Sequence, residues 1–62
     1  MSELVVLREA LEDLYNRLRY VMAYTENEEV YNELERARRA LITAIQAVNN
    51  AIDNAPYEVV ET

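Results

Sequence analysis

The chain of 62 residues contains no cysteine, histidine, glycine or lysine, and it has one proline. Disulfides and the usual structural zinc sites are therefore excluded. Without histidine, cysteine and lysine, the ordinary nucleophile and general-base constellations are missing as well. We expect no enzymatic activity, no cofactor and no bound metal. A domain this small buries little more than half of its unfolded surface, so oligomerisation is the remaining way to stabilise it.

The charge is strongly one-sided. Twelve acidic residues stand against six basic ones, all of them arginine, for a formal net charge of −6. Nucleic-acid binding depends on neutralising phosphates, so this acidity argues against it and favours a basic protein surface as partner. No apolar run reaches membrane-spanning length, and residues 1–7 have neither a basic start nor a cleavage site. We therefore expect a cytoplasmic protein with no membrane partner.

A long amphipathic helix is predicted over residues 26–54, and the rest of the chain is organised around it. Its heptad seam alternates spacings of four and three: Val30, Leu34, Ala37, Leu41, Ala44, Val48, Ala51 and Ala55. One flank of the seam carries large side chains, including Ile42, Ile45 and Ile52, whereas the other is almost entirely alanine. One neighbouring helix can cover only one of these flanks.

A first helix is predicted over about residues 3–24. Its seam is Leu4, Leu7, Leu11, Leu14, Leu18 and Val21. Thr25 followed by Glu28 has the spacing of a capping box and predicts the start of the second helix, the alternative being one continuous kinked helix. Pro56 ends the second helix, and the tail 56–62 either frays or folds back. The fold class is therefore all-α: one domain, residues 1–62, forming an antiparallel helical hairpin.

A lone hairpin leaves one apolar flank in water, so we expect two copies to form a homodimeric four-helix bundle with coiled-coil packing. The expected self-contact is antiparallel between two copies of the second helix, with the two-fold axis within about a turn of Ala44 or Ile45. The predicted oligomer interface consists of Ala37, Leu41, Ala44, Ile45, Val48, Ala51 and Ile52.

Two polar groups are candidate binding residues. Glu28, Glu29 and Glu33 begin the second helix and are the candidate contacts to a basic partner. Arg36, Arg38 and Arg39 could bind an anion between subunits, or they could be neutralised by neighbouring glutamates while their stems cover apolar surface. Five tyrosines could likewise cap the hairpin core or form a binding surface.

Residues 7–14 and 25–30 together resemble the helical hairpin of a family of small aspartyl-phosphate phosphatases. That family's Ser-x-x-x-Asp signature would fall at Leu34 and Arg38, so the resemblance implies no phosphatase activity. In outline the chain is also similar to Rop-type plasmid proteins, in which two hairpins form a four-helix bundle. The predicted function is that of a small acidic interaction protein: an adaptor, an assembly factor, or an inhibitor or accessory protein of viral or plasmid type. The alternative is an oligomeric binder of a small anion such as a nucleotide, using arginine and tyrosine residues from several subunits.

Overall fold

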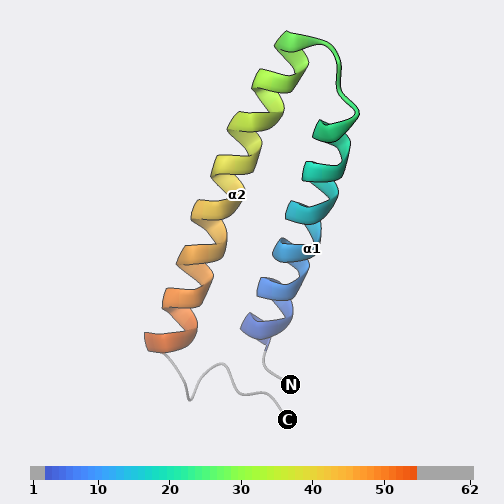
Figure 1. Cartoon of the computed structure of the whole chain (residues 1–62). Coiled ribbons are helices and arrows are strands. Elements are labelled where there is room, and N and C mark those ends of the chain that lie inside the picture. Colours follow the sequence, from blue (N-terminus) through green and yellow to red (C-terminus); the bar gives the residue numbers. More distant parts are fainter. Residues whose placement is uncertain (1–2, 55–62) are drawn as a thin grey trace.

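The structure, a computed structural model, describes residues 3–54 as two helices joined by a short turn (Figure 1). Helix α1 spans Glu3–Ala23 and helix α2 spans Glu28–Asn54. The helices pack side by side and antiparallel, which confirms the predicted all-α helical hairpin and rules out one continuous helix. The predicted seam residue Ala55 and the tail 56–62 lie outside the described residues.

Helix α2 begins two residues later than predicted, because Asn27 caps it. The Asn27 Oδ1 atom accepts a hydrogen bond from the Val30 N–H at 3.0 Å, and the Asn27 carbonyl accepts the first helical bond, from the Tyr31 N–H at 2.9 Å. The Thr25 hydroxyl instead donates to the Val21 carbonyl at 2.8 Å, at the end of α1. The predicted capping box of Thr25 and Glu28 is therefore wrong, since the threonine hydroxyl is occupied by the preceding helix.

Replacing Asn27 by alanine should lower the free energy of unfolding by about 1 kcal/mol, because it removes the side-chain acceptor of an otherwise unpaired helix-start N–H. Thr25→Ala is the matched control. It removes an exposed bond to a carbonyl that water can reach, so it should cost less than Asn27→Ala. Urea denaturation of both variants checks this order, and a larger loss for Thr25→Ala would contradict the assignment of the cap.

The line of contact between the helices differs in phase from the predicted seams. On α1, Leu4, Leu11 and Leu18 are half-buried as expected, but Leu7, Leu14 and Val21 are 45%, 50% and 52% exposed. Their places at the contact are taken by the neighbouring residues Arg8, Tyr15 and Met22. On α2 the half-buried positions are Leu34, Glu35, Arg38, Leu41, Ile42, Ala44, Ile45, Val48, Asn49 and Ile52. Helix α1 thus covers the large-residue flank of α2.

The two broad faces of the hairpin differ in character. One face, the hollow face, is lined by residues such as Arg19 on α1 and Ile42 on α2. Leu14 precedes Arg19 by five residues, and Ala37 precedes Ile42 by five. The two residues of each pair are therefore roughly 140° apart around their helix. Leu14 and Ala37 thus lie on the other side of the line where the helices meet from Arg19 and Ile42.

Because the helices are antiparallel and both right-handed, the side of α1 that carries Leu14 and the side of α2 that carries Ala37 lie on the same broad face, opposite the hollow face. This apolar face consists of Leu7, Leu14 and Val21 from α1 with Val30, Ala37, Ala44 and Ala51 from α2. On this face Val30 is 48% exposed. Among the residues described, only Met22 is buried, with 6% of its surface exposed. The hairpin by itself therefore encloses almost no core.

Candidate functional site

The three candidate anion-binding arginines are occupied by glutamates of the same helix. Arg38 makes a forked pair with Glu35, Nε to Oε1 at 2.9 Å and Nη2 to Oε2 at 2.6 Å. Arg39 Nε lies 3.2 Å from the same Oε2, and Arg36 Nη1 lies 3.3 Å from Glu33 Oε1. All three pairs have i, i+3 or i, i+4 spacing, which places the partners on neighbouring turns. The arrangement agrees with neutralisation of the arginines rather than with a free anion site.

The forked pair shifts the ionisation of both partners. Hydrogen bonds from the Arg38 guanidinium, reinforced by Arg39, lower the pKa of Glu35 from 4.5 to about 2, although partial desolvation acts in the opposite direction. The bond to Glu35 in turn raises the pKa of Arg38, with a further contribution from Tyr15. Both side chains are about three-quarters shielded from solvent. The pair is therefore ionised throughout the physiological pH range.

The Glu35→Gln variant should lose a specific part of the pH dependence of stability. Because folding lowers the pKa of Glu35, its contribution is complete above pH 4.5 and is lost as the pH falls towards about 2. The difference in Tm between the parent and Glu35→Gln should therefore shrink between these pH values. Glu33→Gln, which removes the exposed pair with Arg36, is the control and should change the Tm little. A parent–Glu35→Gln difference independent of pH would contradict the assignment.

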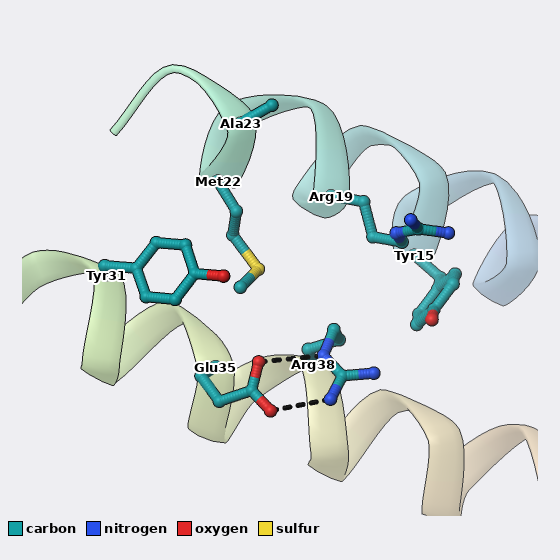
Figure 2. A pocket seen from close by; sticks show the side chains of 7 residues that line it. All are labelled: Tyr15, Arg19, Met22, Ala23, Tyr31, Glu35 and Arg38. Atoms are coloured by element: carbon teal, nitrogen blue, oxygen red, sulfur yellow. Dashed lines mark hydrogen bonds and ion pairs between the residues drawn. The ribbon is translucent and has the colours of Figure 1, made fainter. Parts of the chain in front are cut away.

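A hollow of about 550 Å³ lies beside the forked pair, on the hollow face near the turn (Figure 2). Tyr15 and Arg19 of α1 and Tyr31 of α2 form much of its wall, and Met22 lies between the helices. The Arg19 guanidinium carbon is 5.9 Å from the centre of the Tyr15 ring, within range of a cation–π contact. Arg19 makes no ion pair within residues 3–54. The hollow thus combines an unpaired cation with two aromatic rings.

A smaller hollow of about 250 Å³ continues along the same face. Tyr15 lines it too, together with Glu12, Ile42, Ile45 and Gln46. Beyond it, Arg8 Nη1 donates to Asn49 Oδ1 at 3.2 Å and links the two helices. These contacts explain why Arg8 and Asn49 occupy the helix contact, where the sequence pattern predicted only apolar residues.

The residues of the predicted oligomer interface do not all lie on one surface of the hairpin. Ile45 and Ile52 belong to the large-residue flank that faces α1, whereas Ala37 and Ala51 are exposed on the apolar face. Leu41, Ala44 and Val48 are half-buried. One set of residues predicted as a single interface is therefore split, because α1 already occupies part of it.

The candidate partner-binding glutamates lie at the turn end of the hairpin. Glu28 and Glu29 form the first turn of α2, and Glu33 follows one turn later; all three are exposed. Nearby, the rings of Tyr20 and Tyr24 pack at 4.9 Å between centroids. Both tyrosines are largely exposed, at 66% and 72%, so they do not cap a closed core.

Neither a metal site nor a membrane span is found in the part of the chain that the structure describes. Residues 3–54 contain no group of three acidic side chains placed to hold a metal ion. Within the same range, neither helix is long and apolar enough to cross a membrane. Comparisons with protein-family models, with curated proteins and with solved structures find no match to this chain.

Proposed function

We propose that two copies of this chain form a four-helix bundle that acts as a small acidic, non-enzymatic interaction protein on a basic protein partner. The observation that carries the proposal is the apolar face, where Leu7, Leu14 and Val21 of α1 and Val30 of α2 stay about half exposed and the rest of the α2 stripe is alanine. Covering a few hundred Å² of apolar surface contributes several kcal/mol at about 25 cal/mol per Å². A second copy would supply the core that one hairpin lacks.

The distribution of charge supports a basic partner. Residues 20–35 include the turn and carry five acidic residues and no basic one: Glu26, Glu28, Glu29, Glu33 and Glu35. Glu33 and Glu35 pair with arginines further along α2, whereas Glu28 and Glu29 have no ion pair within residues 3–54. The turn end therefore presents unneutralised negative charge that a basic surface would complement.

Replacing Glu28, Glu29 and Glu33 by glutamine tests the role of the turn. Capture of basic proteins from host lysate should weaken with added salt and be lost in this variant. The control changes Glu9→Gln, Glu12→Gln and Asp13→Asn, which removes the same charge from α1 and should leave capture intact. Equal binding by the parent and the turn variant, or binding that salt does not affect, would overturn the proposal.

The alternative function, binding of a small anion, is favoured by the larger hollow. Its volume is in the range of small-molecule sites, and it offers Arg19 and two tyrosine rings to a flat anionic ligand. Arg38 lines it as well, but its guanidinium is held by Glu35, while Arg36 and Arg39 lie outside the lining.

A thermal-shift screen against nucleotides and other phosphorylated metabolites separates the two functions. A ligand present at a hundred times its dissociation constant should add about 2.7 kcal/mol to the free energy of unfolding. A shift that Arg19→Ala or Arg38→Ala abolishes would establish the anion binder and overturn the interaction protein. Arg36→Ala is the matched control, because that side chain does not line the hollow.

A further inference from the structure

The apolar face has the dimensions of a protein–protein interface. The hairpin is a single layer with Cα extents of 45 × 17 × 9 Å, so each broad face projects roughly 700–800 Å², close to the ~800 Å² that each partner contributes to a standard interface. The apolar face is also long, and the two hollows described above lie on the opposite side of the hairpin. A surface of this shape suits another single-layer hairpin.

The two stripes of the apolar face are centred at the same height along the hairpin. Leu7, Leu14 and Val21 are centred on Leu14, whereas the α2 stripe from Val30 to Ala51 is centred near residues 40 and 41. Tyr15, next to Leu14, lines one hollow with Arg38 and the other with Ile42, so this part of α1 is level with the middle of the α2 stripe. A single two-fold axis that lies along the apolar face, perpendicular to the helices, can therefore pass through the centres of both stripes.

We propose that a second copy docks on this face about that axis, with the two turns at opposite ends of the bundle. The inference rests on the proposed dimer and specifies its geometry. Helix α1 then packs on the partner's α1, Leu14 against the partner's Leu14, while α2 packs on the partner's α2, Ala37 against the partner's Ala44. The α1 stripe is thus part of the interface, and the two-fold axis passes near residues 40 and 41 of α2, about one turn from Ala44.

The proposed arrangement separates the two acidic turns, which the arrangement with both turns at the same end would bring together. Placing the turns together would bring two copies of the unneutralised Glu26, Glu28 and Glu29 group to within about a Debye length of each other. In the proposed arrangement each turn instead lies beside the open end of its partner, where Arg8 offsets part of the negative charge of Glu3, Glu9 and Asp53. The two acidic turn groups are kept apart by the length of the hairpin.

Side-chain volume is compatible with the same geometry. Alanines on α2 allow two copies of that helix to approach closely, whereas leucines on α1 require a wider separation, and both fall within the 8–10 Å found between packed helices. The resulting bundle carries one acidic turn at each end. The assembled protein is then bivalent, with two equivalent acidic sites for a basic partner.

Single cysteine substitutions test the geometry without background, because the chain has no cysteine of its own. Leu14→Cys places the thiol on the proposed axis, so mild oxidation should convert most of the protein to a disulfide-linked dimer. Asn16→Cys, exposed on the side of α1 away from the apolar face, is the control and should give little linked dimer.

A second pair of variants keeps the test decisive if Leu14→Cys disturbs packing. A mixture of Leu7→Cys and Val21→Cys chains should form the mixed disulfide, because the proposed axis brings these positions together. If instead Leu14→Cys links to Ala44→Cys chains and not to itself, the turns lie at the same end and the geometry is overturned while the dimer stands. A protein that sediments as a monomer would remove the proposed dimer itself.

Discussion

The Leu14→Glu variant should fail to dimerise at concentrations where the parent is fully dimeric. In one hairpin Leu14 is 50% exposed, so a glutamate there could reach water. On the proposed two-fold axis, however, two carboxylates would meet in an apolar interface, where each is desolvated and neither has a cation to pair with. We expect the dissociation constant to rise at least about a hundredfold, which corresponds to roughly 3 kcal/mol.

Asn16→Glu is the matched control for this substitution. It introduces the same side chain two residues away, on the exposed side of α1 that faces away from the apolar face. The dissociation constant of this variant should stay within about threefold of the parent. Size-exclusion chromatography at several concentrations measures both variants, and a dimer that tolerates Leu14→Glu would exclude the α1 stripe from the interface.

Replacing Ala44 by leucine should destabilise the dimer by about 1–3 kcal/mol. The residue is half-buried at the edge of the helix contact and belongs to the alanine flank that the proposed dimer brings against its own copy. A larger side chain would force the two α2 helices apart and disturb packing along the interface. The loss should appear as a lower Tm whose value depends on protein concentration.

Thr43→Leu provides the comparison, because it adds apolar volume at the neighbouring exposed position, on the outer side of α2. Its Tm should lie close to that of the parent. If Ala44→Leu were as stable as Thr43→Leu, the alanine flank would not form a close helix contact.

The helices themselves follow from the sequence, because alternating three- and four-residue spacings identify apolar stripes without reference to a partner. The rotation of each helix about its own axis, which decides which residues face the other helix, does not follow from the sequence. The stripe on α1 includes Leu7, Leu11 and Leu14, and one neighbouring helix can cover only part of that width. Whether the contact falls on Leu14 or on Tyr15 depends on the fit to α2, which the spacing does not contain.

Local ion pairs were more predictable than the hollow beside them. Arg38 and Glu35 are three residues apart on one helix, so their contact is expected from geometry alone. The hollow near the turn combines Tyr15 and Arg19 with Tyr31, which is distant in sequence. Finding the hollow from the sequence requires knowing that α1 is rotated so that Tyr15 faces α2. The leucine spacing predicted a different rotation, with Leu14 at the contact.

Likewise, the cap of α2 was misassigned because two residues could serve. Thr25 and Asn27 are both good N-cap residues, and the capping-box spacing favoured the threonine. The spacing does not show that α1 ends at Ala23, where the Thr25 hydroxyl is close enough to reach the Val21 carbonyl.

Sedimentation equilibrium at low micromolar concentration tests the central claim most directly, because it measures mass without assuming a shape. The account predicts a mass of two chains, with dissociation on dilution and a midpoint of unfolding that rises with protein concentration. A mass of one chain, together with unfolding that does not depend on concentration, would contradict it. The hairpin would then be stable with its apolar face in water.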